Sequence, residues 1–187
     1  MKLLATRLER LGFCVDNWGY NSLVGSVEQH AIRLRRHLQN YEDTGTTFHI
    51  VAHSMGCVIV RASHEIEPIV NQGRVVFLTP PHHGSPVARC ASGVLGWCVP
   101  VLYQLSDAEG SFVRKLPSPK DMEFSELTAE YDILVPNSST HLFGERDYAT
   151  VKGTHASNLF STQTATMISS FLQTGRFDDF KGNSLRH

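Results

Sequence analysis

Short apolar runs of the length of a β-strand alternate along this chain with longer stretches in which apolar residues recur at helical spacing. The strand candidates are residues 13–18, 48–52 and 74–79, with weaker patterns at residues 122–128 and 148–152. Spacings of three and four residues predict helices at residues 4–11, 24–38, 57–66 and 159–172. Strands that are joined through helices pair in parallel. The sequence therefore predicts an α/β fold with a mostly parallel sheet and helices on both of its faces.

The length and composition fit one globular domain. The chain has 187 residues, of which 41% are hydrophobic, so we expect residues 1–187 to share a single core. Residues 82–121 do not follow the alternation, and we expect them to form an insertion that is partly helical around residues 92–105. Two interpretations of this insertion are open. It is either a lid or wall for an apolar substrate, or a core-packing helix with ordinary connecting loops.

Charge and cysteine usage argue against several classes of function. Lys and Arg number 17 against 18 Asp and Glu, so the net charge of −1 predicts no binding to nucleic acid. The longest nearly apolar stretch, residues 93–103, is shorter than the roughly 20 residues that cross a bilayer, which predicts no integral membrane segment. The four cysteines have no CxxC spacing, and Arg7, Glu9 and Arg10 interrupt any signal-like apolar region. We therefore expect a cytoplasmic protein with reduced thiols.

The segment Ile50-Val-Ala-His-Ser-Met-Gly56 joins an apolar strand to a helix through a small-x-Ser-x-Gly turn. In a nucleophile elbow, such a turn strains the serine and lifts its Oγ away from the sheet. The turn brings positions 52 and 56 close together, so it requires small residues there, and Ala52 and Gly56 meet this requirement. The backbone N–H of Met55 would then point toward a developing oxyanion. The alternative interpretation is that Ser54 is an ordinary helix cap.

A serine nucleophile of normal pKa needs a general base, and the base needs a carboxylate that orients it. His155 follows the last strand candidate directly and fits the role of the base. Asp132 follows the preceding strand candidate and is the favoured acid. Asp147 competes for this role, but it is predicted at the start of the last strand. Catalytic groups gather at the opposite, carboxyl ends of parallel strands.

The most specific pattern in the chain is an ordered set of segments, which are His49-Ile-Val-Ala-His-Ser-Met-Gly56, Val75-Val-Phe-Leu-Thr-Pro-Pro-His-His-Gly-Ser85, Asp132-Ile-Leu-Val-Pro136 with Ser138, Ser139 and Leu142, Gly153-Thr-His155, and Phe171-Leu-Gln-Thr-Gly-Arg-Phe177. This set spans nearly the whole chain and resembles the α/β-hydrolase superfamily, in particular its lipase- and esterase-like branch. The resemblance implies a serine hydrolase acting on esters without a cofactor. It further implies Ser54, Asp132 and His155 as the triad and the Met55 N–H as one oxyanion donor.

The beginning of the chain departs from the family pattern. Proteins of this type carry, before the helix that residues 1–11 resemble, a strand ending in a His-Gly loop that supplies the second oxyanion donor. The resemblance implies that this absent strand would lie between the strands at residues 13–18 and 48–52. Loss of one such donor costs about 10²–10³ in rate. We expect either that the natural reading frame begins further upstream or that the chain is a shortened, weakly active or inactive member.

Ten histidines raise the question of a metal centre. Adjacent His82 and His83 cannot easily both face one metal, and neither an HExxH motif nor a carboxylate at ligand spacing accompanies them, so we predict no catalytic metal. We expect His53, His82, His83 and Trp97 to border the substrate site. In the alternative, His82 and His83 hold the proline-rich loop and His53 packs under the elbow. The remaining single histidines read as surface residues, and they include His30, His37, His64, His141 and His187.

Together these patterns predict a carboxylic ester hydrolase, esterase- or lipase-like, that is acylated at Ser54 and acts on a small-molecule ester or a lipid. The oligomeric state is left open. A second interpretation is a non-catalytic or weakly active binding protein of the same fold, because the first strand and the oxyanion loop are missing. Acyl transfer to an alcohol would use the same acyl-enzyme and is not separated from hydrolysis by the sequence.

Overall fold

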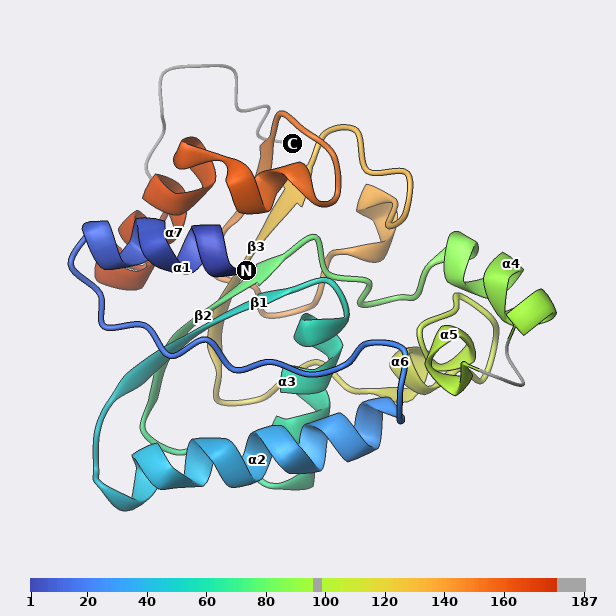
Figure 1. Ribbon diagram of the computed structural model, residues 1–187, viewed down its shortest axis with the longest axis horizontal. Helices are drawn as coiled ribbons and strands as arrows, with labels where there is room; N and C mark the ends of the chain where they lie inside the picture. The colour runs from blue at the N-terminus through green and yellow to red at the C-terminus, as the bar shows by residue number, and fades with distance from the viewer. Residues whose placement is uncertain (96–98, 178–187) are drawn as a thin grey trace.

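The computed structural model describes residues 1–95 and 99–177, which are arranged around one parallel β-sheet (Figure 1). The strand order follows the sequence: β1 (Phe48–His53), β2 (Gln72–Leu78), β3 (Glu123–Ala129) and β4 (Tyr148–Val151). The register places His53 beside Leu78 and Leu78 beside Leu127. The carboxyl ends of the strands therefore lie level with one another at one edge of the sheet.

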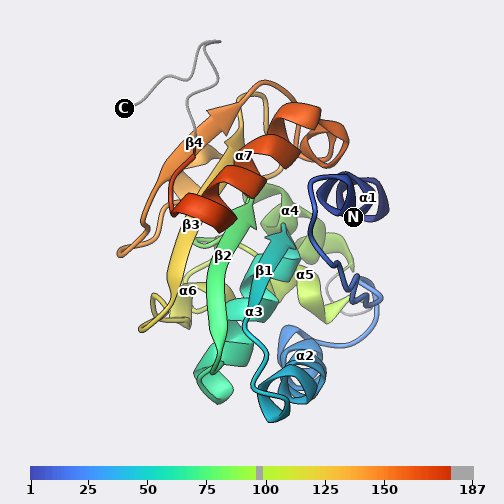
Figure 2. The ribbon, with the colours of Figure 1, turned by 90° about the vertical axis from the view of Figure 1, so that its left-hand side faces the viewer.

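Helices cover both faces of the sheet, as the sequence predicts (Figure 2). One face carries α1 (Lys2–Arg10) and α7 (Thr162–Thr174), and the other carries α2 (Val27–Asp43) and α3 (Met55–Ile66). Each face has its own apolar cluster, because successive strand residues alternate between the two sides. Phe77 and Phe124 belong to the cluster with α2 and α3, whereas Val76 and Leu127 belong to the cluster with α1 and α7.

Local sequence signals account for the helix ends. The Ser26 side chain accepts a hydrogen bond from the Gln29 N–H, and Gln29 reciprocates, so α2 begins at a capping box. The side chain of Ser161 accepts a hydrogen bond from the Thr164 N–H and caps α7. Gly175 ends α7 in the left-handed conformation, with φ of 80°, which a glycine adopts without strain. Two short 3₁₀ helices, Asn137–Ser139 and Ser157–Phe160, lie in the connections around β4.

The predicted strand at residues 13–18 is wrong, because this segment has no regular secondary structure. The sheet ends at β1 on this side, within the residues that the structure describes. A strand must pair its N–H and C=O groups with a neighbour, and this segment makes no ladder with β1. Its side chains instead anchor it to both layers: Phe13 packs on the cluster of α1 and α7, and Trp18 on the cluster of α2 and α3.

Residues 82–121 form most of an excursion between β2 and β3 that contains three helices, α4 (Pro86–Leu95), α5 (Pro100–Gln104) and α6 (Phe112–Lys115). Val101 of α5 and Val113 of α6 are buried in the same core as α2 and α3. In contrast, α4 stands away from the sheet (Figure 1) and leaves Val94 74% exposed. The excursion thus combines core-packing helices with one helix that presents apolar side chains to solvent.

None of the helices formed by residues 1–95 and 99–177 has both the length and the apolar character needed to span a bilayer.

Candidate active site

Ser54, Asp132 and His155 follow β1, β3 and β4 at the carboxyl edge of the sheet. Backbone hydrogen bonds continue past the ends of β3 and β4 and hold the two loops side by side. The Glu130 N–H donates to the Val151 carbonyl at 2.9 Å, and the Tyr131 N–H donates to the Gly153 carbonyl at 3.0 Å. This pairing brings the segment that carries Asp132 next to the segment that carries His155.

Ser54 has the backbone conformation expected of a nucleophile elbow. Its φ of 53° and ψ of −124° lie in a region that L-amino acids rarely adopt, at a cost of about 1–3 kcal/mol. The Ser54 N–H donates to the Leu78 carbonyl at 2.9 Å, which fixes the turn to β2. The serine side chain makes no capping hydrogen bond to α3, so Ser54 is not an ordinary helix cap.

The side chains of Ser54, His155 and Asp132 are joined in this order by two hydrogen bonds. Oγ of Ser54 lies 2.8 Å from Nε2 of His155, and Nδ1 of His155 lies 2.7 Å from Oδ2 of Asp132. The His155 side chain is 12% exposed and the Asp132 side chain is 2% exposed. The structure thus brings together the three residues that the sequence predicted as a triad.

Asp132 is held in place from its second oxygen. Oδ1 accepts hydrogen bonds from the N–H groups of Leu134 and Val135, both at 2.9 Å. Burial alone would raise the pKa of Asp132, but the hydrogen bonds from His155 and from the Val135 N–H outweigh it, so the pKa lies below its ordinary value. The carboxylate is therefore ionised at neutral pH and faces His155 in a fixed orientation.

His53 packs against His155, the candidate general base. A carbonyl oxygen can only accept, so Nε2 of His53 donates its hydrogen bond, at 3.0 Å, to the backbone carbonyl of His155. The rings of His53 and His155 are tilted against one another with centroids 4.9 Å apart. Burial lowers the pKa of His53 to about 4, against a smaller opposing effect of this hydrogen bond. His53 is therefore neutral at physiological pH and packs beside the elbow, the alternative role that the sequence left open.

The close approach of positions 52 and 56 is also found. A Cβ placed on Gly56 would lie 3.9 Å from the Cβ of Ala52, and 3.6 Å from the hydroxyl of Tyr20. Both distances are ordinary van der Waals contacts, so the turn tolerates an alanine at position 56 better than the sequence argument implied. The sequence analysis did not single out Tyr20, which reaches the elbow from the irregular segment before α2. Burial raises the pKa of this tyrosine.

Met55 is the first residue of α3 and its side chain is buried. The first N–H groups of a helix have no acceptor within the helix, so the Met55 N–H is suited to hold an anionic oxygen. The next residues anchor the elbow: the Cys57 N–H donates to the Ser54 carbonyl, and the Cys57 side chain is completely buried. Burial also raises the pKa of the Cys57 thiol, which fits its predicted packing role.

The other predicted substrate contacts have different positions. His82 is 1% exposed and its Nδ1 accepts a hydrogen bond from Arg61 at 3.2 Å, so its position does not match a substrate contact. The reason is that the chain turns inward after β2 and covers this ring. His83 is exposed, and its Nε2 donates to the His141 carbonyl at 2.8 Å, which holds its loop to the connection before β4. Trp97 lies outside the described residues.

Asp147 lies at the amino end of β4, as predicted. Its carboxylate accepts hydrogen bonds from the Tyr148 N–H at 2.9 Å and from the Phe177 N–H at 2.8 Å. These contacts tie the start of β4 to the segment after α7. Asp147 is therefore a structural carboxylate, at the opposite end of the strand from His155.

Among the histidines predicted at the surface, His141 is exposed and His37 is half-buried. The prediction is wrong for His30 and His64, which are both buried. Each is held by a backbone carbonyl, that of Val24 for His30 and that of Lys120 for His64. A polar side chain inside a helix gives no periodic signal for such a tertiary partner, which explains the error. His187 lies outside the described residues.

No protein-family model matches the sequence, and no curated protein matches it significantly. Solved structures do match. A putative hydrolase of the α/β superfamily from Xanthomonas campestris is 16% identical with a TM-score of 0.57, over 92% of this chain and 88% of that one. An esterase from Pyrobaculum calidifontis is 16% identical with a TM-score of 0.58, over 94% of this chain and 70% of that one.

Phospholipase PlaB from Legionella pneumophila is 20% identical with a TM-score of 0.50, over 67% of this chain. The match spans only 33% of that protein, so this chain corresponds to about a third of its length. At these identities the likenesses show the fold alone. The chain therefore has the α/β-hydrolase fold, here with a four-stranded parallel sheet.

Proposed function

We propose that this protein is a serine hydrolase that cleaves carboxylic esters through an acyl-enzyme on Ser54. One observation carries the proposal: the hydrogen-bonded line from Ser54 through His155 to Asp132, at the carboxyl edge of the sheet. Lipases and esterases are among the solved structures with a similar fold, which supports an ester bond as the target.

The tautomer of His155 follows from its partners. An ionised carboxylate can only accept, so Nδ1 of His155 donates to Asp132. Nε2 of the neutral ring is then free to accept the proton of the Ser54 hydroxyl. In the acylation step Oγ attacks the ester carbonyl while Nε2 takes this proton. Nε2 then returns the proton to the leaving alcohol as the tetrahedral intermediate collapses.

Two groups stabilise the charges that develop. The carboxylate of Asp132 stabilises the imidazolium form of His155. The Met55 N–H, at the start of α3, donates to the oxyanion of the intermediate. In the deacylation step a water molecule gives its proton to Nε2 of His155 and attacks the acyl carbonyl. The proton then passes to Oγ, and Ser54 is regenerated.

Apolar surface near the acid loop supports an apolar acyl group. Ile133 and Leu134 follow Asp132 and are 85% and 40% exposed. The Ser85 hydroxyl donates to the Leu134 carbonyl, which joins this loop to the start of α4. α4 in turn exposes Val87 and Val94. We propose that these side chains contact the acyl chain of an ester or lipid substrate, with α4 as a wall of the site.

A second candidate is a non-catalytic or weakly active binding protein of the same fold. The observation that favours it concerns the oxyanion hole, which needs a second donor when complete: among residues 1–95 and 99–177 we identify only the Met55 N–H. A single donor lowers the rate by about 10²–10³ without preventing acylation. We therefore prefer a slow hydrolase to an inert one.

The test is labelling with a fluorophosphonate probe, with the adduct located by mass spectrometry. We expect one adduct, on Ser54, that is lost in the Ser54→Ala variant. The control is Ser138→Ala, which removes an exposed serine that is not hydrogen-bonded to His155 or Asp132 and should keep the adduct. A folded protein that is not labelled at Ser54 would support the non-catalytic candidate. A panel of p-nitrophenyl esters of increasing acyl length then measures the preference for an apolar chain.

A further inference from the structure

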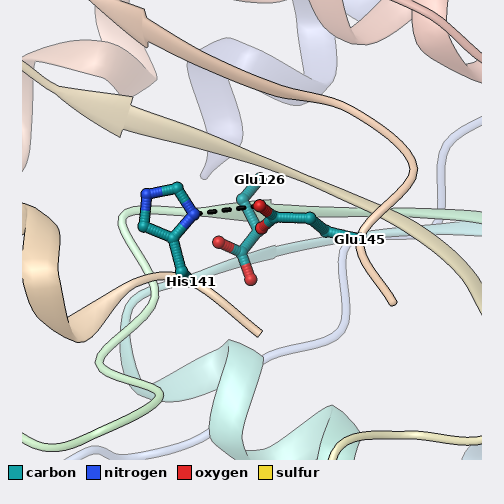
Figure 3. Close-up of side chains that lie close together, drawn as sticks. All are labelled: Glu126, His141 and Glu145. Carbon is teal, nitrogen blue, oxygen red and sulfur yellow. Dashed lines mark hydrogen bonds and ion pairs between the residues drawn. The ribbon is translucent and has the colours of Figure 1, made fainter. Parts of the chain in front are cut away.

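A second cluster of polar side chains lies away from Ser54, between β3 and the connection that precedes β4 (Figure 3). Glu126 is in the middle of β3, and His141 and Glu145 are in the connection. One ligand atom of each residue, an imidazole nitrogen or a carboxylate oxygen, lies within 4.8 Å of the others. Figure 3 shows the three side chains close together, with a hydrogen bond between His141 and Glu145.

Glu126 is the unusual member of this cluster. It is completely buried, and neither of its carboxylate oxygens has a hydrogen-bond partner among the described residues. The Leu142 N–H and the Glu145 carboxyl group lie near it, but without the geometry of a hydrogen bond. Oε2 of Glu145 is also buried and unpartnered. Burying an ionised carboxylate without a partner is costly, so Glu126 either holds a proton or is balanced by a bound cation.

Arg61, the positively charged side chain whose field acts on Glu126, makes its hydrogen bonds to other groups. Arg61 of α3 donates to Nδ1 of His82 and to the backbone carbonyls of Leu116 and Pro117. Because Nδ1 of His82 accepts, this ring is neutral, and its Nε2 lies 3.4 Å from Oε1 of Glu126. Burial and the neighbouring Glu145 raise the pKa of Glu126 to about 10, so the site lacks enough positive charge to hold two ionised carboxylates.

His141 completes the set from the solvent side. Its ring stacks on Tyr148 with centroids 4.0 Å apart, and its Nδ1 lies 2.9 Å from Oε1 of Glu145. The His141 side chain is 51% exposed, whereas that of Glu145 is 23% exposed. The buried carboxyl group of Glu126 thus lies on the inner side of the cluster. The exposed imidazole of His141 lies on its solvent side, where water has access.

We propose that Glu126, Glu145 and His141 bind a divalent first-row transition-metal cation, with Zn²⁺ as the best fit. One imidazole with two carboxylates is a ligand set that Zn²⁺ accepts, while Mg²⁺ and Ca²⁺ prefer oxygen ligands alone. Ligand atoms around a tetrahedral Zn²⁺ lie about 3.4 Å apart, so the side chains must close by little more than an ångström. Rotation of Glu145 and of the exposed His141 supplies this movement.

The cation would have a structural role. It would join the middle of β3 to the connection between β3 and β4, and the same connection carries Asp132. The loop after β2 is tied to this connection as well, through the hydrogen bond from His83 to the His141 carbonyl. The proposal does not depend on the proposed ester hydrolysis, because none of the three ligands contacts Ser54, His155 or Asp132.

The alternative occupant of the site is a proton shared between Glu126 and Glu145. The two occupants predict opposite results in a titration. Carboxylate and imidazole groups bind a metal only in their deprotonated forms, so the affinity for Zn²⁺ should fall as the pH is lowered. A shared proton alone predicts no saturable binding of metal.

The experiment is calorimetric titration of the full chain without a histidine tag, after treatment with a chelator, with Zn²⁺, Mn²⁺ and Mg²⁺ in turn. We expect one equivalent of Zn²⁺ to bind, more tightly than Mg²⁺. Loss of a direct ligand should weaken binding at least about 100-fold in Glu126→Gln and in His141→Gln. Saturating Zn²⁺ should raise the thermal midpoint of the wild type by roughly 5–10 °C and leave that of Glu126→Gln unchanged.

His37→Gln is the matched control, because His37 is bonded to Asp16 in a separate cluster of a histidine and a carboxylate. This variant should bind Zn²⁺ like the wild type. His141→Gln changes an exposed residue and Glu126→Gln keeps the size and shape of a buried, uncharged side chain, so both variants should fold. The proposal is wrong if the wild type binds no Zn²⁺ up to about 1 mM, or if Glu126→Gln and His141→Gln bind it as tightly as the wild type.

Discussion

Ser54, His155 and Asp132 come from three separate parts of the chain, and each is held by backbone contacts of its own. Ser54 is fixed by its strained turn, Asp132 by two N–H groups, and His155 by the hydrogen bond from His53 to its carbonyl. Such a preorganised set needs little rearrangement when charge develops during a reaction. The contribution of single residues can therefore be tested one at a time.

Asp132→Asn should lower kcat for a p-nitrophenyl ester by about 10⁴-fold, because an amide at this position can hold His155 in the wrong tautomer. The fold should be intact, since the Asn oxygen can still accept from the Leu134 and Val135 N–H groups. Steady-state kinetics and circular dichroism measure the two effects. The control is Asp147→Asn, which should lower the thermal midpoint while leaving kcat of the folded protein nearly unchanged. Equal kcat values for the two variants would contradict the assignment of the acid.

His53 should make the stability of the protein depend on pH. Its pKa is about 4 in the folded protein, and a histidine in the unfolded chain titrates near about 6.5. Between these values the unfolded state binds more protons, so the free energy of unfolding falls as the pH is lowered from about 6.5 toward about 4. We expect a loss of about 1–2 kcal/mol between about pH 7 and about pH 5.

Urea denaturation at the two pH values measures this loss. His53→Gln keeps a donor for the His155 carbonyl but does not titrate, so its stability should change less over the same range. If the variant lost as much stability as the wild type, the pH dependence would come from another group.

At the scale of elements, the segment that follows β4 shows how a loop positions a functional side chain. Gly153 has φ of 143°, and a Cβ at this position would collide with the hydroxyl of Ser157. That hydroxyl accepts a hydrogen bond from the Thr154 N–H at 2.7 Å and closes the turn around His155. The glycine is therefore required by the backbone conformation and by the space beside it.

Gly153→Ala should destabilise the protein by about 1–3 kcal/mol and lower its esterase activity, because the turn that carries His155 must shift. Gly93→Ala is the matched control. Gly93 lies inside α4 with no neighbouring atom within 4 Å of an added Cβ, so alanine there should be neutral or stabilising by up to about 1 kcal/mol. Thermal denaturation and ester turnover of both variants test this difference, and a Gly153→Ala protein as active and stable as the wild type would contradict it.

The tertiary contacts of buried charged side chains were harder to predict than the helices and strands themselves. Arg35 belongs to a run of arginines on α2, yet it is buried and forms ion pairs with Glu42 at 2.7 Å and Glu67 at 3.2 Å. The buried cluster of Arg61, His82 and Glu126 is similar, since its members come from α3, the loop after β2 and β3. Charged residues at these positions give no periodic signal, because their partners are distant in the sequence.

At the scale of the whole molecule, the sheet has an unpaired edge at β1 within the described residues. The Phe48 N–H donates to the carbonyl of Asn71, just before β2, and the Ser54 N–H donates to the carbonyl of Leu78, at the end of β2. Since N–H groups alternate in direction along a strand, those of Ile50 and Ala52 also face β2, and those of His49 and Val51 face outward.

Hydrogen exchange measured by NMR should follow this alternation. The amides of Ile50 and Ala52 should exchange slowly, like those in the centre of β2, while the amides of His49 and Val51 should exchange much faster. Equal protection of all four amides would mean that another strand pairs with β1 in solution.

The sequence by itself determined the alternation of strands and helices, the parallel sheet with two covered faces, and the three residues at the ends of β1, β3 and β4. These features follow from local periodicity and from the rule that parallel strands share one carboxyl edge. Only the tertiary structure decided that residues 13–18 do not form a strand, because a strand exists only with a partner for its backbone groups. It also decided that His82 is buried and that Glu126, His141 and Glu145 converge. Such contacts depend on distances between segments that no local pattern records.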